Sequence, residues 1–279
     1  MSETATSIHQ NGRHIRLKWH KLRRHAGEPP FSPYNLRYGL SVGASMEVDI
    51  QPLADGNWVF LHDEVLDAET DGSGPVAAIG EEQVRLLRIR GGEFSPPLLS
   101  DLAPAFDRAH PGACLQFDLK GDATSISDLA AHQFAAAVAP IAAQCLVSGT
   151  DWAAVTRLGR SVSGLKLGFD PQDLVIARMP VVRDQFENVL EEILELASGA
   201  DTYYLSHQFV TAALAVGCNP VEKLKSGVGF VDVWTLDPTM AEFWSILSVV
   251  AEAGADQITT NDPSDLASSL NIRAEAARK

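Results

Sequence analysis

Short runs of apolar and β-branched residues recur along the chain and alternate with stretches of helical periodicity. The runs predict strands near residues 15, 47, 115, 146, 166, 203, 231 and 258. Between them, positions 181–197 repeat their apolar residues with the period of an amphipathic helix. Regular alternation of strands and helices is typical of a parallel sheet, and eight such units predict an α/β fold of the (β/α)8 (TIM) barrel class.

An open, doubly wound sheet is the alternative to the barrel. No glycine-rich dinucleotide fingerprint follows the first predicted strand, which weakens that alternative. Residues 64–97 are rich in Gly, Pro, Thr and acidic residues, so we expect a small insertion after the second strand, lying over the barrel mouth. The prediction is therefore a single domain over residues 1–279 that carries this insertion.

Several local predictions accompany this fold. Residues 1–13 are polar and are expected to form a flexible tail. Helices are expected over 98–109, 126–143, 151–158 and 238–253, with Asp151 and Asp237 as N-caps of the last two.

Charge and composition exclude several classes of function. A net charge of −14, with 36 acidic against 22 basic residues, argues against binding to nucleic acid or to an anionic membrane surface. No apolar run approaches the roughly 20 residues of a membrane span, and the first residues lack the apolar core of a secretory signal. Three widely spaced cysteines in apolar contexts predict free thiols, and we therefore expect a cytoplasmic protein.

Candidate chemistry gathers at the predicted strands. Glu47 and Asp49 are two residues apart, so on a strand their side chains project to one face. Two adjacent carboxylates repel one another unless they share a proton or bind a cation. Asp118 ends a later strand, and together the three carboxylates offer hard oxygen ligands suited to Mg²⁺ or Ca²⁺. His20 and His62 follow two other strands and are candidates for a general base and a general acid.

Several motifs carry a resemblance to a known family. The chain resembles the glycerophosphodiester phosphodiesterases in a specific early block and in weaker later pieces, over roughly residues 14 to 265. The matching segments are His20-Lys21, Glu47-Val48-Asp49, Asp55-Gly56, His62-Asp63, Phe117-Asp118-Leu119-Lys120, Val233-Trp234-Thr235 and the closing stretch from Ala255 to Asp262.

The resemblance implies a metal-dependent phosphodiesterase that releases a phosphomonoester, such as glycerol 3-phosphate, and an alcohol. It assigns catalysis to His20 and His62 and the metal, Mg²⁺ or Ca²⁺, to Glu47, Asp49 and Asp118. Phosphate and substrate contacts are expected from five further residues: Lys21, Arg24, Lys120, His207 and Trp234. The expected partner is a small-molecule phosphodiester.

Three departures from the family pattern leave the substrate open. Lys21 stands where the family has arginine, which removes the bidentate fork suited to phosphate, although Arg23 or Arg24 could supply one. Asp118 replaces the usual glutamate, and Ser32-Pro33-Tyr34-Asn35 replaces the family's Pro-Glu-Asn-Thr. The alternatives are a sugar phosphodiester of the agrocinopine type as substrate, or a barrel that binds metal or phosphodiester without catalysis. A metal-dependent aldolase or isomerase is a third, disfavoured by the absence of a lone lysine at an apolar strand end.

Overall fold

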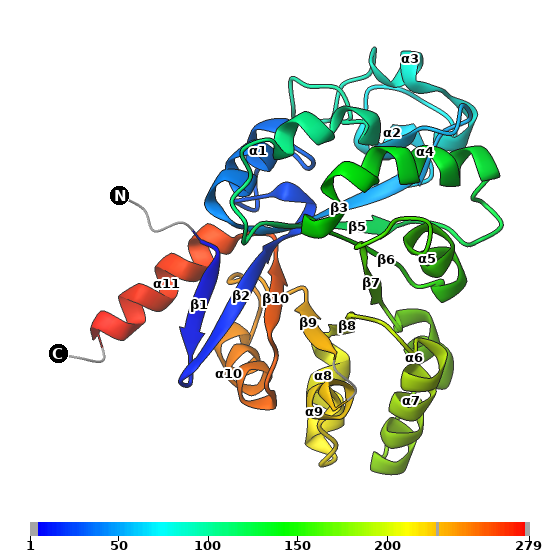
Figure 1. The fold of residues 1–279 in the computed structure, drawn as a ribbon. Helices are drawn as coiled ribbons and strands as arrows, with labels where there is room; N and C mark the ends of the chain where they lie inside the picture. The colour runs from blue at the N-terminus through cyan, green and yellow to red at the C-terminus, as the bar shows by residue number, and fades with distance from the viewer. Residues whose placement is uncertain (1–4, 227–228, 277–279) are drawn as a thin grey trace. The chain divides into compact units, whose positions relative to one another are not determined.

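The computed structural model describes residues 5–226 and 229–276, and within them eight strands run parallel to their neighbours and alternate with helical segments (Figure 1). The eight coincide with the predicted strands, and the fold is of the (β/α)8 barrel class. Their bounds are β2 (Arg13–Trp19), β3 (Ser45–Pro52), β5 (Cys114–Leu119), β6 (Cys145–Ser148), β7 (Lys166–Phe169), β8 (Thr202–Ser206), β9 (Phe230–Trp234) and β10 (Gln257–Thr260).

The chain divides into two compact units. Unit 2 comprises His20–Leu167, and unit 1 comprises the described residues up to Trp19 together with those from Gly168 onward. In unit 2 the strands follow the order β6-β5-β3-β4, where the short β4 (Trp58–Phe60) pairs antiparallel with β3. In unit 1 the order is β1-β2-β10-β9-β8-β7.

In unit 2 an aromatic cluster anchors the helices on the strands. The Phe134 ring of α4 (Asp128–Val138) meets Trp58 and Phe117 edge-to-face, at centroid distances of 5.7 and 6.1 Å. Such pairs are favourable beyond their area of burial. Unit 2 also contains α1 (Pro33–Val42), α5 (Trp152–Gly159) and the 3₁₀ segments η1 (His20–Leu22), η3 (Leu99–Asp101), η4 (Ala103–Phe106) and η5 (Ala139–Gln144).

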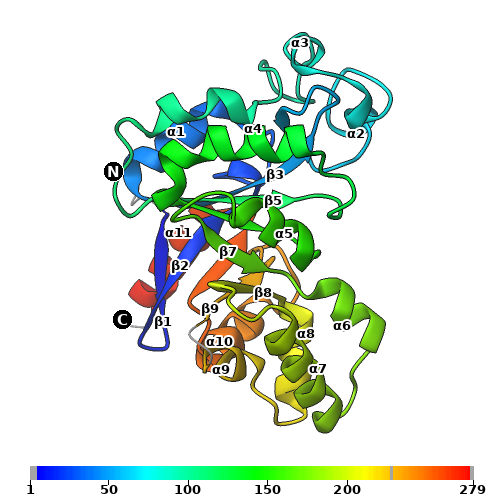
Figure 2. The same ribbon diagram turned by 45° about the vertical axis from the view of Figure 1, so that its right-hand side comes forward.

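Unit 1 buries an ion pair among its strands. Lys18 Nζ lies 3.1 Å from an oxygen of Asp232, and both side chains are almost fully buried. Gln257 and Thr259 donate hydrogen bonds to the same carboxylate, so the buried charge is well satisfied. The helices are α6 (Gln172–Arg178), α7 (Arg183–Leu196), α8 (His207–Ala215), α9 (Pro220–Lys225), α10 (Phe243–Ala253) and α11 (Pro263–Ala276), with α8 and α9 side by side in Figure 2.

Residues 64–97 contain only short helical pieces, α2 (Leu66–Glu69), η2 (Val76–Ala78) and α3 (Glu81–Val84). The segment is anchored within unit 2, where the Glu81 carboxylate accepts a hydrogen bond from Asn57 and the Glu81 N–H donates to Asp55. An irregular insertion after the second barrel strand was expected. Its place over the barrel mouth and the single-domain organisation stay predictions.

The polar N-terminal segment is not a tail throughout. Ser7–Gln10 forms β1, which pairs antiparallel with β2 so that His9 lies opposite His14. The turn at Asn11 and Gly12 adopts positive φ angles, which these residue types tolerate well. A hairpin therefore extends the first barrel strand.

Three predicted helices differ from the structure. The helix expected over 98–109 is wrong, because η3 and η4 are separate 3₁₀ turns and Pro104 provides no N–H for a continuous α-helix. The helix expected over 126–143 begins at Asp128 and changes at Ala139, one residue before Pro140, from α4 to the 3₁₀ segment η5. The helix expected over 238–253 begins only at Phe243, since the Asp237 carboxylate accepts hydrogen bonds from Thr260 and Asn261 instead of capping a helix. Helices α6 and α9 were not predicted.

Among the described residues, no helix is long and apolar enough to cross a membrane.

Candidate active site

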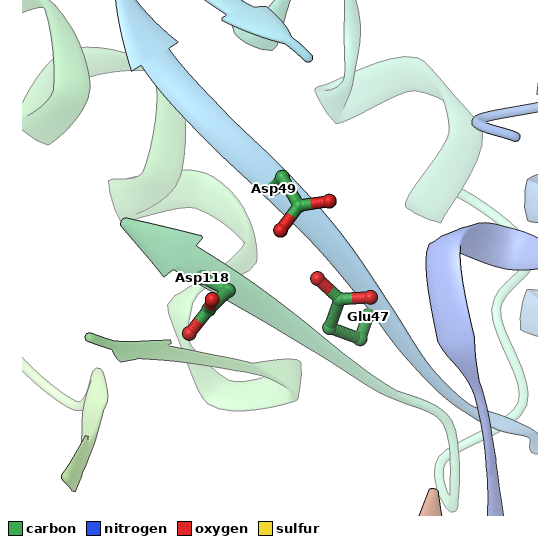
Figure 3. Close-up of side chains that lie close together, drawn as sticks. All are labelled: Glu47, Asp49 and Asp118. Atoms are coloured by element: carbon green, nitrogen blue, oxygen red, sulfur yellow. The ribbon is translucent and has the colours of Figure 1, made fainter. Parts of the chain in front are cut away.

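Three carboxylates meet on two neighbouring strands of unit 2. Strands β3 and β5 pair in parallel with Asp49 opposite Asp118, and Glu47 lies two residues before Asp49 on the same face. One oxygen of each carboxylate lies within 4.8 Å of one oxygen of both others. Figure 3 shows the three side chains close together on β3 and β5. The predicted metal ligands are therefore brought together by strand register, and we call them the carboxylate triad.

Two lysines hold the triad together electrostatically. Lys120 Nζ lies 2.9 Å from Asp49 Oδ1 and 2.6 Å from Asp118 Oδ2. Lys21 Nζ lies 3.3 Å from the other Asp49 oxygen. Partly buried ion pairs of this kind are screened little by solvent. Both lysines predicted to face the phosphate thus lie at the triad.

Two members of the triad, Glu47 and Asp49, have pKa values shifted in opposite directions. Burial, followed by the charges of Asp49 and Asp118, raises the pKa of Glu47 well above its usual value. Burial also acts to raise the pKa of Asp49, but the ammonium groups of Lys120 and Lys21 outweigh it and hold that pKa below its usual range. Without a bound cation, Glu47 therefore keeps a proton more readily than Asp49 does.

His20 and Lys21 reach the triad through an unusual backbone. Lys21 adopts the left-handed conformation (φ 53°, ψ 35°), which is strained for a non-glycine residue. In this conformation the Lys21 N–H donates a 2.8 Å hydrogen bond to Glu47 Oε2, and His20 Nε2 lies 3.9 Å from the same oxygen. The local strain thus aims the predicted catalytic histidine and the following lysine at one carboxylate.

His62 is held by two carboxylates. Its Nδ1 lies 2.8 Å from Asp63 Oδ1, and its backbone N–H donates to Glu69 Oε2 at 2.6 Å. Its half-exposed ring is close enough to the triad to contribute to the lowered pKa of Asp49. His62 therefore has an oriented ring that remains open to a ligand.

Sequence reasoning missed the groups that position the site. Glu69, from the insertion, accepts from the His62 backbone and lies 3.8 Å from Lys21 Nζ. Ser148 donates to Asp118 and accepts in turn from Gln116. Gln116 could have been found from its buried face, since it lies opposite Glu47 on the paired strand. The sequence pattern could not identify Glu69 as a site residue, because it lies in an irregular segment.

Three further residues were predicted to contact the substrate, and each is described within its own unit. The Arg24 guanidinium stacks over the Tyr38 ring of α1, 4.5 Å from its centroid. His207, the first residue of α8, is buried in unit 1, and burial lowers the pKa of its ring. Trp234 is the last residue of β9 and lines a cavity of unit 1. Their roles stay predictions.

The carboxylate triad fits a hard divalent cation. All three side chains offer carboxylate oxygens, the ligands that Mg²⁺ and Ca²⁺ prefer. Asp49 Oδ2 is buried and accepts no hydrogen bond among the described residues, although Lys21 lies nearby. A buried carboxylate oxygen in this state is available to a metal ion.

Comparisons with known proteins place the fold. No family model matches the chain, and no curated protein sequence matches it either. Among solved structures, a protein of Agrobacterium tumefaciens provisionally assigned as a glycerophosphoryl diester phosphodiesterase aligns with a TM-score of 0.70 at 17% identity, over 95% of this chain and 99% of its own. The chain has the (β/α)8 barrel fold.

Two further solved structures agree with this result. A phosphodiesterase of Oleispira antarctica, in complex with the product sn-glycerol-3-phosphate, gives a TM-score of 0.65 at 18% identity, over 91% of this chain and 96% of its own. A glycerophosphodiester phosphodiesterase of Agrobacterium tumefaciens gives a TM-score of 0.64 at 16% identity, over 91% of this chain and 98% of its own. The two Agrobacterium tumefaciens structures carry the name of the family that the sequence motifs resemble.

Proposed function

We propose that this protein is a metal-dependent phosphodiesterase that hydrolyses a small glycerophosphodiester-like molecule to a phosphomonoester and an alcohol. The observation that carries the proposal is the carboxylate triad, with Lys21, Lys120 and His20 around it. Support comes from two sources: the motifs resemble glycerophosphodiester phosphodiesterases, and the solved structures with a similar fold include a glycerophosphodiester phosphodiesterase.

The cation belongs to the triad. Glu47, Asp49 and Asp118 would hold Mg²⁺ or Ca²⁺, which would supply Lewis acidity and positive charge to a phosphate oxygen. The ammonium groups of Lys21 and Lys120 add positive charge at the same place and favour an anionic substrate over a neutral one.

The two histidines supply proton transfer. His20, beside Glu47, and His62, held by Asp63, act as base and acid on the nucleophile and on the leaving alcohol. Asp63 Oδ1 lies 2.8 Å from His62 Nδ1 and fixes the orientation of the ring, which leaves its other nitrogen for the substrate. We assign the general acid to His62 and the general base to His20.

The substrate is proposed to be a glycerophosphodiester. The neighbour from Oleispira antarctica is in complex with sn-glycerol-3-phosphate, the phosphomonoester that such a substrate would release. The same proposal places the protein in the cytoplasm, where its three cysteines, which are free thiols, would stay reduced.

Hydrolysis of glycerophosphocholine, of a sugar phosphodiester and of an aryl phosphodiester, each with Mg²⁺ or Ca²⁺ and then with chelator, tests this function. We expect chelator-sensitive turnover that falls about 10²–10⁴-fold in His62→Ala. Glu47→Gln is expected to abolish turnover, since it removes a ligand charge.

The matched control is His25→Ala, which removes an exposed histidine of the same unit. It should retain the activity of the unmodified protein. Turnover of none of the three esters, or near-native turnover in His62→Ala, would contradict the proposal. Preferential hydrolysis of the sugar phosphodiester would keep the reaction and change the substrate.

A further inference from the structure

Glu69 brings a fourth carboxylate to the site in unit 2. It is the last residue of α2, in the insertion, and its side chain is only 13% exposed. One oxygen, Oε2, accepts hydrogen bonds from the N–H groups of His62 and Asp63, at 2.6 and 3.2 Å. The other, Oε1, lies 3.8 Å from Lys21 Nζ, beyond hydrogen-bond distance. The two oxygens therefore have separate surroundings.

The hydrogen bonds of Glu69 do not require its charge. An amide oxygen also accepts from two backbone N–H groups, so a glutamine could keep both bonds. The turn has a second support as well, because Gln51 Nε2 donates to the carbonyl groups of Leu61 and Asp63. What a carboxylate adds at this position is a negative charge close to the Lys21 ammonium.

That charge changes the electrostatic balance of the site. The Lys21 ammonium lies 3.3 Å from an oxygen of Asp49 and 3.8 Å from one of Glu69, while Lys120 pairs with two carboxylates of the triad. The triad and Glu69 thus supply four negative charges against two ammonium groups. A bound divalent cation would make this set of groups neutral, whereas without Glu69 the set would be positive.

The substrate and the product of the proposed reaction differ in charge. A phosphodiester carries one negative charge, whereas a phosphomonoester approaches two at neutral pH, because its second pKa is near 6. The electrostatic energy of an anion beside Lys21 is proportional to the charge of that anion. Repulsion by Glu69 therefore acts about twice as strongly on the monoester as on the diester.

We propose that Glu69 is a specificity-determining residue, whose charge disfavours dianionic phosphomonoesters relative to monoanionic phosphodiesters and thereby favours release of the product. The inference rests on the proposed function for the statement that the phosphate of a diester binds beside Lys21. It gives the insertion a part in the choice of ligand.

The competing interpretation is that Glu69 only positions the backbone of His62. Two substitutions separate the interpretations. Glu69→Gln keeps a hydrogen-bond acceptor and removes the charge, whereas Glu69→Asp keeps the charge and shortens the side chain by one methylene. If the charge decides, the anion preference changes in Glu69→Gln and persists in Glu69→Asp. A purely positioning role predicts the same fold-change for every anion in each variant.

Calorimetric titration with sulfate and with methyl sulfate, in Mg²⁺ at one pH and one ionic strength, tests the inference. Sulfate is a dianion and methyl sulfate is a monoanion of similar shape, and neither is a phosphodiester. We expect Glu69→Gln to bind methyl sulfate about threefold more tightly than the unmodified protein does. For sulfate we expect the square of that factor, about ninefold, because the ligand charge is doubled. Glu69→Asp should keep the preference of the unmodified protein.

Glu64→Gln is the matched control, because it removes the same charge from an exposed glutamate of the same insertion. It should bind both anions like the unmodified protein. Equal gains for the two anions in Glu69→Gln, or the same gains in Glu64→Gln, would overturn the inference. Failure of both anions to bind any of these proteins would also overturn it.

Turnover separates this inference from the proposed function. In a hydrolysis assay, Glu69→Gln should lower the inhibition constant of glycerol 3-phosphate more than it lowers KM. Hydrolysis without the charge-dependent gain in binding would contradict the role of Glu69 and leave the proposed function standing. A charge-dependent gain without hydrolysis of any ester would establish the anion preference and contradict the proposed function.

Discussion

Glu47 shows how one buried carboxyl group can couple the stability of the fold to the charge of the site. Its pKa in the folded protein is raised by burial and by its two acidic neighbours. The folded state therefore holds this proton more tightly than the unfolded state does. The corresponding stability is fully present below the unfolded pKa, near 4.3, and is lost as pH rises through the higher folded value.

Replacement of Glu47 by glutamine should remove this pH dependence. With chelator present, we expect Glu47→Gln and the unmodified protein to have similar free energies of unfolding at pH 4. The variant should become the more stable one as pH rises toward 8, by about 1.4 kcal/mol for each unit by which the pKa is raised. Urea unfolding across this pH range measures the difference.

The control for this experiment is Glu82→Gln, which changes an exposed glutamate of α3. Its difference from the unmodified protein should stay within about 0.5 kcal/mol at every pH. A flat difference for Glu47→Gln as well would mean that Glu47 is ionised in the folded protein, with Lys21 and Lys120 supplying the compensation.

At the scale of single elements, the start of α5 is specified by one side chain. Asp151 Oδ1 accepts hydrogen bonds from the N–H groups of Ala153 and Ala154, and its Oδ2 accepts from Ala123. The predicted N-cap is confirmed, with an added link to the preceding loop. Asp151→Ala should therefore cost about 1–2 kcal/mol of stability and leave the site intact.

Asp128→Ala is the comparison for this cap. Asp128 lies in the first turn of α4, is fully exposed and pairs with Arg157 at the surface. Exposed ion pairs contribute about 0–1 kcal/mol, so this variant should be nearly neutral in urea unfolding. Equal losses in the two variants would show that the bonds of Asp151 add nothing beyond its charge.

The eight barrel strands could be predicted because most of their residues are buried and appear as short apolar runs between polar loops. Glu47, Asp49 and Asp118 could be placed together because spacing and parallel register determine which side chains share a face. These properties depend on local sequence and on the fold class alone.

Long-range contacts explain why the predicted helix cap at Asp237 is wrong and why the role of Glu69 was missed. Asp237 resembles a helix cap, but Thr260 and Asn261 of the next strand and loop occupy its carboxylate. Glu69 resembles a surface acid of an irregular segment, yet it fixes the backbone of His62. Neither partner can be identified from neighbouring residues, so a capping rule or a composition argument gives the wrong answer at both positions.

At the scale of the whole molecule, the net charge of −14 means that any cation stabilises the protein to some degree. Specific binding at the triad must therefore be separated from general screening. A cation that binds only the folded state adds RT ln(1 + [L]/Kd), about 2.7 kcal/mol at 100 times Kd. In the triad this gain also favours the ionised form of Glu47, which burial opposes.

Thermal unfolding with Mg²⁺ or Ca²⁺, at an ionic strength matched with KCl, is expected to show a Tm higher by several degrees than KCl alone. Asp49→Asn should abolish that difference, because it removes the central charge of the triad. Asp184→Asn, which neutralises an exposed carboxylate of α7, changes the net charge by the same amount and should keep the full shift. Equal shifts in both variants would mean that the cations act through the overall charge, and the metal site would have to be abandoned. A shift lost only in Asp49→Asn would assign the cation to the triad without any measurement of activity.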